Sequence, residues 1–177
     1  MKVLAAMEYE GVRIDEKALA IMSQDLKKES EKVQKEIYKI AGAEFNIGSP
    51  KQLGEILFDK LKLADLPSGQ AGKTKKTKTG QYATGEDVLL KLAANNKIVD
   101  DILVFREFTK LKSTYVDALP LMINKKTGRV HTSYAQAVAV TGRLSSNNPN
   151  LQNIPIRTER GREIRKAFIP RDKDHVL

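Results

Sequence analysis

Apolar residues recur every three or four positions over the first two thirds of the chain, which predicts a series of amphipathic helices. The first helix is expected over residues 15–41, with Asp15 capping its start and Gly42 ending it. Its opposite face is rich in Lys and Glu and is expected to be solvated. The apolar stripe consists of Leu19, Met22, Leu26, Val33, Ile37 and Ile40.

The next two helices are predicted from capping signals. Ser49 is followed by proline, which suits the first helical position, and by Gln52, which can complete a capping box. This helix is expected to run to about Leu61. A third helix is expected after Thr84, where a Thr-x-x-Asp pattern again indicates a cap, and it should end near residues 94–96.

A fourth, long helix is expected from Lys97 to Leu119, with Pro120 limiting it. The stretch at 64–83 lacks helical periodicity and is rich in Lys, Thr, Gly and Ser, so it is expected to be a loop. The buried side of the fourth helix should consist of Ile98, Ile102, Phe105, Phe108, Leu111 and Tyr115.

After the fourth helix, the pattern changes to that of short strands. A turn is expected at 126–129, and RVHTSY (129–134) and AVAVTGR (137–143) show the partial alternation of two strands. A short basic helix should cover 161–167. The expected fold class is mainly α with a small α+β C-terminal part. Because so few strands bury little apolar surface, residues 121–177 are expected to be an incomplete domain.

Composition and charge narrow the function. The 177 residues are 41% hydrophobic and 30% charged, which fits a soluble globular protein, and no apolar run could cross a membrane. The absence of cysteine and the presence of only two histidines exclude disulfides, thiolate zinc sites and histidine-rich metal sites. The formal charge of +9 favours a polyanionic partner such as nucleic acid, although a solubility role explains it equally well.

Two features of the helical part could bind phosphate. One is the lysine loop, AGKTKKTKTGQYAT, in which four lysines fall within six positions: Lys73, Lys75, Lys76 and Lys78. The other is the helix start at Ser49 and Lys51, where free backbone amides and the helix dipole attract anions. A solvated loop and an ordinary helix cap are the alternative interpretations.

The segment TGRLSSNNPNLQNIPIRT, residues 141–158, interleaves Arg, Asn and Gln with apolar anchors. Such side chains can donate to the purine N3 and pyrimidine O2 acceptors of the minor groove. The alternative is a polar loop that satisfies its own backbone through Asx turns. We favour that alternative for Asn147 and Asn148, but not for Arg143 and Asn153.

No catalytic residue and no metal ligand can be assigned from the residues themselves. His131 lies in a strand-like run without an acidic partner and is expected to be structural. Asp172 and Asp174 lie in a charged turn that lacks the apolar surroundings of a metal-binding carboxylate.

Four blocks of the chain resemble successive blocks of bacterial family A DNA polymerases, in the same order and over nearly the whole length. They are MEYEGVRID, FNIGSPKQLGEILFDKLKL, FREFTKLKSTYVDALP and GRVHTSYAQAVAVTGRLSSNNPNLQNIPIRTERGREIRKAF. The string TGRLSS-x-x-PNLQNIP-x-R is the most specific of these signals.

The resemblance implies a long-helix thumb followed by the first antiparallel strands of a truncated palm. Residues 1–15 would be the end of the connection to an exonuclease domain, 16–120 the thumb and 121–177 the incomplete palm. Duplex DNA, as primer-template, would be the partner. Its contacts would come from Ser49, Lys51, Lys73, Lys75, Lys76, Lys78, Lys110, Lys112, Arg143, Asn150, Gln152, Asn153 and Arg157.

The family's catalytic aspartates lie beyond the last residue of this chain, so the fragment alone is expected to be inactive. The complete enzyme would be a DNA-directed DNA polymerase of replication and repair, a nucleotidyltransferase that uses deoxynucleotides and two Mg²⁺ ions. It would work in the bacterial cytoplasm at the nucleoid, without a membrane partner. The truncated palm edge is expected to self-associate with a second copy or to be partly disordered.

Two alternatives come from other functional classes. A self-contained basic helical module that binds nucleic acid would explain the charge and the lysine loop. A helical module that binds another protein through its Lys/Glu-rich helix is the second alternative.

Overall fold

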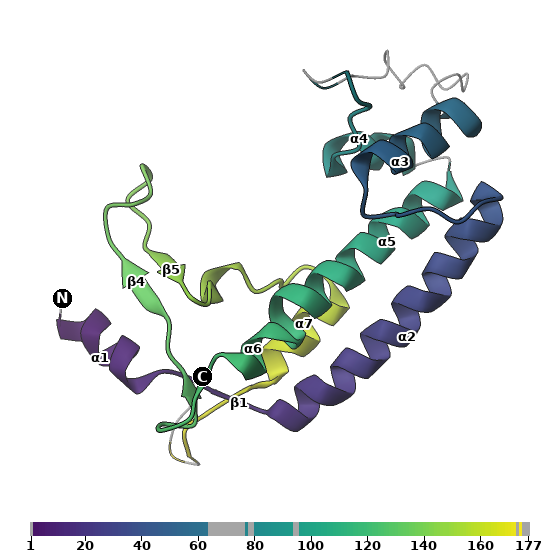
Figure 1. Ribbon diagram of the computed structural model, residues 1–177. Coiled ribbons are helices and arrows are strands. Elements are labelled where there is room, and N and C mark those ends of the chain that lie inside the picture. The colour runs from purple at the N-terminus through teal and green to yellow at the C-terminus, as the bar shows by residue number, and fades with distance from the viewer. Residues whose placement is uncertain (1, 64–76, 78–79, 94–95, 173, 175–177) are drawn as a thin grey trace. The chain divides into compact units, whose positions relative to one another are not determined.

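The computed structural model describes residues 2–63, 77, 80–93, 96–172 and 174 (Figure 1). The four lysines predicted to bind phosphate at 73–78, and His175, lie outside the described residues. The chain divides into two compact units. The first unit combines Met1–Leu26 with Lys110–Leu177, and the second unit is Lys27–Thr109. Within the described part of the chain, no helix has the length and apolar character of a membrane span.

The first long helix is confirmed as α2, Glu16–Ala41. An Oδ1 atom of Asp15 accepts a hydrogen bond from the Ala18 amide at 3.0 Å, which caps its start as predicted. Gly42 ends the helix with a positive φ of 64°. The predicted apolar stripe is wrong at its last position, because Ile40 is exposed and Ala41 is buried instead.

The helix after Ser49 is confirmed, but its capping box is not. It consists of α3, Pro50–Gly54, followed by a π-helical stretch η1, Glu55–Lys60. Ser49 Oγ accepts a long hydrogen bond of 3.5 Å from the Gln52 amide. The Gln52 side chain does not return to Ser49, because its Oε1 accepts from the Asn46 amide at 2.7 Å and thereby holds the loop before the helix.

The third helix, α4, spans Glu86–Ala93, and its predicted threonine cap is wrong. The Gly85 carbonyl accepts from the amides of Val88 and Leu89, so Gly85 takes the capping position. Thr84 is buried, and its carbonyl accepts a hydrogen bond from Arg106 Nη1 at 2.6 Å.

The fourth predicted helix is a run of three pieces: α5 (Lys97–Leu111), the π-helix η3 (Lys112–Val116) and α6 (Ala118–Leu121). The prediction that Pro120 limits this helix is therefore wrong, because Pro120 lies inside α6. The core of the second unit packs residues of these helices and their loops: Ile37, Ala41, Ile47, Leu53, Leu57, Phe58, Leu63, Leu89, Leu92, Ile98, Val99 and Ile102.

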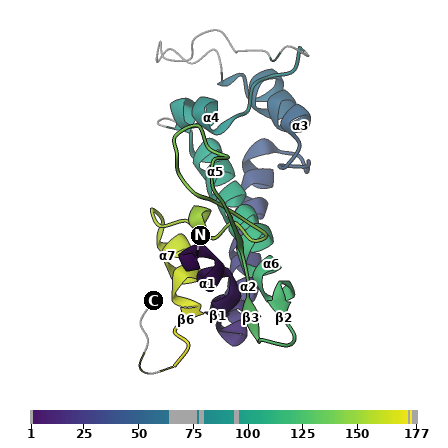
Figure 2. The same cartoon turned by 90° about the vertical axis from the view of Figure 1, so that its left-hand side faces the viewer.

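The first unit holds short strands in three antiparallel pairs, β1–β6, β2–β3 and β4–β5. Their bounds, with those of the helices of this unit, are α1 Lys2–Glu10, β1 Arg13–Ile14, β2 Ile123–Asn124, β3 Arg129–Val130, β4 Ser133–Ala135, β5 Ser145–Asn147, η4 Leu151–Asn153, α7 Glu159–Lys166 and β6 Phe168–Ile169. A bridge between Val12 and Val130 joins two of the pairs, so Figure 2 shows β6, β1, β3 and β2 side by side.

The predicted turn at 126–129 is confirmed by the β2–β3 hairpin, where Gly128 has a φ of 66°. The strand predicted for AVAVTGR, 137–143, is wrong. The partner of β4 is β5, with Tyr134 opposite Ser146. Val138 and Val140 are both exposed, so their alternation does not reflect a buried face.

Candidate nucleic-acid interface

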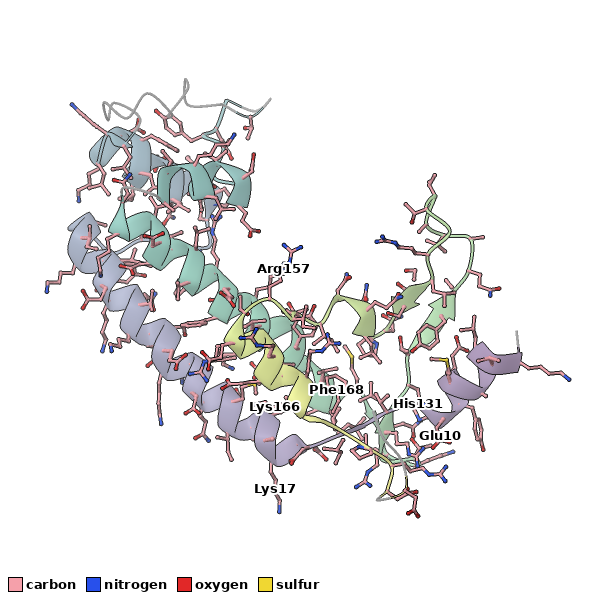
Figure 3. The ribbon with its side chains drawn as sticks, turned by 180° about the vertical axis from the view of Figure 1, so that it is seen from behind. Glu10, Lys17, His131, Arg157, Lys166 and Phe168 are labelled. Atoms are coloured by element: carbon pink, nitrogen blue, oxygen red, sulfur yellow. The ribbon has the colours of Figure 1, made fainter. Side chains whose placement is uncertain are left out.

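Residues 141–158, called here the interface segment, lie in the first unit. They run through β5 and the short 3₁₀ turn η4 to the start of α7. All of the DNA-binding residues predicted for it are exposed, namely Arg143, Asn150, Gln152, Asn153 and Arg157. Figure 3 shows the Arg157 side chain pointing away from the ribbon. The segment thus presents both cationic and amide donors to solvent.

Buried hydroxyl groups hold the backbone of this segment. Tyr115 Oη, from η3, donates to the Asn153 carbonyl at 2.5 Å. Thr132 Oγ1 lies 3.0 Å from the Asn147 carbonyl oxygen and 2.7 Å from that of Pro149. All three hydrogen bonds join a side chain of the fold to a backbone carbonyl, so they fix the path of the segment and leave its own side chains available.

Asn150 forms the Asx-type cap of η4. Its Oδ1 accepts from the Gln152 amide at 3.1 Å and from Ser146 Oγ at 3.1 Å. The Asx turn expected among Asn147 to Asn150 is thus found at Asn150. Asn148 instead adopts a left-handed conformation, with a φ of 51°, which asparagine tolerates better than most residues.

The two lysines of the first unit that were predicted to contact DNA, Lys110 and Lys112, differ in environment. Lys110 is exposed. The ammonium group of Lys112 is held within the fold, 2.5 Å from Asp117 Oδ2 and 3.0 Å from Ser23 Oγ, so it joins η3 to α2. The predicted contact of Lys112 with a DNA backbone stays a prediction, and it would compete with this ion pair.

The same contacts set the acidity of Asp117. Burial acts to raise the pKa of its carboxyl group, but hydrogen bonds from Lys112 and Ser23 and the charge of Lys112 outweigh burial. The pKa therefore lies below its ordinary value of 3.8, and the carboxylate stays charged at neutral pH.

In the second unit, Ser49 is half-buried and Lys51 is exposed at the start of α3. Their role in phosphate binding stays a prediction, as does that of the lysine loop outside the described residues. Sequence reasoning missed Tyr115, Thr132 and Ser146 as residues of the site. The apolar spacing places Tyr115 only on the buried side of the fourth predicted helix, since its partner Asn153 lies 38 residues further along the chain.

The comparisons with known proteins decide the family. A family model described as "DNA polymerase family A" matches residues 16–177. The chain belongs to this family. It is 51% identical over 175 residues to DNA polymerase I of Geobacillus stearothermophilus and 52% identical over 176 residues to that of Synechocystis sp. strain PCC 6803. Each alignment covers 99% of this chain but only 19% and 17% of the respective relative.

A solved structure agrees with the family A assignment. The polymerase domain of Pol1 from M. smegmatis, in complex with DNA primer-template and dNTP, matches with a TM-score of 0.82 and 42% identity. The match covers 96% of this chain and 28% of the solved one. The predicted family and fold class, mainly helical with a few short antiparallel strands, are thereby confirmed. The chain spans about a fifth of the length of its curated DNA polymerase I relatives.

The described part of this family A chain does not fit a two-metal site, since it contains no group of three or more His, Asp or Glu residues that could hold a metal. His131 has a structural environment, as predicted. Its Nδ1 lies 2.8 Å from the Glu8 carbonyl and its Nε2 lies 2.7 Å from Thr127 Oγ1. No catalytic step can therefore be assigned to these residues.

The carboxylate of Glu10, at the end of α1, binds two arginines that lie more than 100 residues further along the chain. It pairs with Arg129 and Arg171, and hydrogen bonds from these two arginines lower the pKa of Glu10.

Proposed function

We propose that this chain is the thumb and the first part of the palm of a bacterial DNA polymerase I, and that it binds primer-template duplex DNA. One observation carries the proposal. The interface segment exposes Arg143, Gln152, Asn153 and Arg157, while buried hydroxyls hold its backbone. A solvated loop without a partner would not need such a frame. The Pol1 relative solved in complex with DNA primer-template supports the choice of ligand.

The proposed contacts divide into two kinds. Lysines of the second unit, with Lys110, would contact phosphates and supply salt-dependent affinity without sequence preference. The amides of Asn150, Gln152 and Asn153, together with Arg143, would donate to minor-groove acceptors that every base pair presents. Such contacts favour a correctly shaped pair over a malformed one, because a displaced acceptor leaves a donor without its partner.

The complete polymerase would be a DNA-directed DNA polymerase of replication and repair that acts on deoxynucleotides with two Mg²⁺ ions. This chain would contribute DNA binding and no catalytic group. The proposed domain limits are 1–15, 16–120 and 121–177, and the proposed location is the bacterial cytoplasm at the nucleoid. Self-association through the palm edge belongs to the same proposal and would appear in size-exclusion chromatography as a dimer.

Fluorescence anisotropy across a salt series tests the proposal, with a recessed primer-template, a blunt duplex and a single strand as probes. The test variant carries Ala at Lys73, Lys75, Lys76 and Lys78. The control variant carries Ala at Lys27, Lys28, Lys32 and Lys35, which are exposed on α2. Both variants lower the formal charge from +9 to +5, that is 9 − 4, so only the position of the charge differs.

We expect duplex binding with a dissociation constant of about 1 μM at low salt. The test variant should bind more weakly, and its slope of log K against log salt should be shallower by as much as about 3–4, since each lost phosphate contact contributes about 0.9. The control variant should keep the slope of the wild type. Equal effects of both variants would reduce the interaction to net charge, and no duplex binding at low salt would reject the proposal.

A further inference from the structure

Strand pairing ends within the interface segment before the amide side chains that are proposed to contact DNA, those of Asn150, Gln152 and Asn153. The β4–β5 pair ends at Asn147, and the following residues are held by side chains of other elements. The only regular element between Asn147 and α7 is η4, a 3₁₀ turn of three residues. Such a short turn has little stability of its own. The positions of Gln152 and Asn153 therefore depend on restraints from outside the turn.

Tyr115 supplies the restraint that lies nearest to these side chains. It is one of the two buried residues of η3, together with Val116. Its hydroxyl donates to the carbonyl of Asn153, which is the last residue of η4. Burial raises the pKa of Tyr115 above its ordinary value of 10.0, so the hydroxyl keeps the proton that it donates.

Ser146 restrains the other end of the same turn. It is fully buried, and its Oγ donates to Asn150 Oδ1 at 3.1 Å and accepts from the Gln152 amide at 3.3 Å. The turn is thus held at its first residues by Ser146 and at its last by Tyr115. The side chains of Gln152 and Asn153, which lie between these two points, remain exposed.

We propose that Tyr115 is a positioning residue of the DNA interface, which through the Asn153 carbonyl sets where the amides of Gln152 and Asn153 meet the minor-groove edge. The proposal rests on the proposed function and adds that different residues determine specificity and affinity. Tyr115 governs discrimination between base-pair edges, whereas the lysines govern overall affinity. The hydroxyl itself does not contact DNA.

Tyr115→Phe removes only the hydroxyl and keeps the buried ring. The control is Tyr38→Phe in the second unit, because Tyr38 Oη also donates to a backbone carbonyl, that of Phe45, at 2.8 Å. Tyr38 is half-buried and its Oη also accepts from Gln34 Nε2 at 2.7 Å, so the control loses this second hydrogen bond as well and is the larger change of the two. Comparing Tyr115→Phe with Tyr38→Phe separates the effect of losing a hydrogen bond at the interface segment from the effect of losing one elsewhere in the protein.

The first measurement needs no DNA. Amide hydrogen exchange of ¹⁵N-labelled protein should show residues 151–154 exchanging about two- to tenfold faster in Tyr115→Phe than in the wild type, the effect of losing one hydrogen bond. Tyr38→Phe should leave these amides unchanged. Equal exchange in Tyr115→Phe and the wild type would overturn the proposal, and so would equal acceleration by both variants.

The second measurement compares a primer-template whose terminal guanine is natural with one that carries 3-deazaguanine, which lacks the minor-groove N3 acceptor. The wild type and Tyr38→Phe should bind the natural end more tightly. In Tyr115→Phe this preference should fall about two- to tenfold, with an unchanged salt slope. An equal loss of affinity for both probes would mean that Tyr115 has only a structural role.

The two measurements fail separately. If the wild type does not bind duplex DNA, the proposed function falls, while the exchange data still decide whether Tyr115 holds the turn. Ser146→Ala provides an independent check should Tyr115→Phe fold poorly. It removes the restraint at the other end of η4, so the Gln152 amide should exchange faster and the preference for natural guanine should fall. An unchanged preference in Ser146→Ala would contradict the proposal.

Discussion

At the scale of single residues, polar contacts in the first unit are made between partners far apart in the sequence. Ser23, Lys112 and Asp117 form one such group, in which Asp117 Oδ1 also accepts from Ser23 Oγ at 2.7 Å. The group joins α2 to η3, the element that also carries Tyr115. Its contribution to stability must depend on pH, since the pKa of Asp117 is lowered in the folded state.

The sign follows from that lowered pKa. A carboxyl group of this kind stabilises the fold above its ordinary value of 3.8, and the contribution is lost as the pH falls through the folded-state pKa. We expect Asp117→Asn to lower the free energy of unfolding by about 0.2–1 kcal/mol at about pH 7, a range suited to a half-exposed pair. Below about pH 4 the difference from the wild type should shrink.

Urea unfolding of the wild type and Asp117→Asn at several pH values measures this difference. Lys112→Met serves as the second variant, because removing the cation should abolish most of the benefit of the Asp117 charge. Unfolding free energies that stay parallel from neutral to acidic pH would show that the ion pair contributes nothing.

At the scale of elements, the helix caps differ in quality. Thr158 has extended backbone angles before α7, and its Oγ1 accepts from the Gly161 amide at 3.2 Å. Ser49 makes the corresponding contact before α3 at 3.5 Å, the limit of a hydrogen bond. The α7 cap also directly follows Arg157, so it fixes the end of the interface segment.

We expect Thr158→Ala to lower the free energy of unfolding by about 1–2 kcal/mol and Ser49→Ala to lower it by less than about 0.5 kcal/mol. The reason is that the Thr158 hydrogen bond has the better length of the two. Thermal unfolding monitored by circular dichroism would give both values. A larger loss for Ser49→Ala would show that the length of the capping hydrogen bond does not predict how much each cap stabilises the protein.

Much of the element order could be predicted from the sequence, because helix periodicity and caps are local signals. Asp15 and Gly42 marked the ends of α2 correctly. The alternating valines at 137–143 misled, since alternation indicates one buried face only when a partner strand covers it, and Val138 and Val140 are exposed. The Thr84 cap failed because that residue is buried against Arg106, a tertiary contact.

The candidate site was predictable only in part. Its exposed donors appear in the string from Arg143 to Arg157, and the family resemblance gave them a role that stays a prediction. The groups that hold this string come from Tyr115 and Thr132, whose partners lie 38 and 15–17 residues away. No spacing rule connects a side chain with a carbonyl at such separations, so only the structure shows the frame.

At the scale of the whole molecule, the two units have different make-up. The second unit has an extensive apolar core formed by helices, in which Ile102 is fully buried. The first unit has short strand pairs joined by polar contacts. Local opening should follow this division, because cooperative units of exchange usually coincide with compact parts of a structure.

We expect Ile102→Ala to destabilise the second unit by about 2–5 kcal/mol through the lost methyl groups and the cavity left behind. Hydrogen exchange with mass spectrometry should show the loss of protection concentrated in peptides from Lys27–Thr109. The control Val104→Ala changes an exposed position of the same helix and should have little effect. Uniform loss of protection across the chain would mean that the two units unfold together.

The strand pair β1–β6 limits the order in which parts of the chain can fold during synthesis. Arg13 donates to the Arg171 carbonyl, 158 residues later, so β1 must wait for β6 to be synthesised. At about 5–20 residues per second, this delay amounts to about 8–30 s. All partners of the second-unit core lie within residues 27–109, which emerge together and much sooner. On the ribosome, residues 27–109 can thus fold first, while β1 stays without its partner strand until β6 has been synthesised.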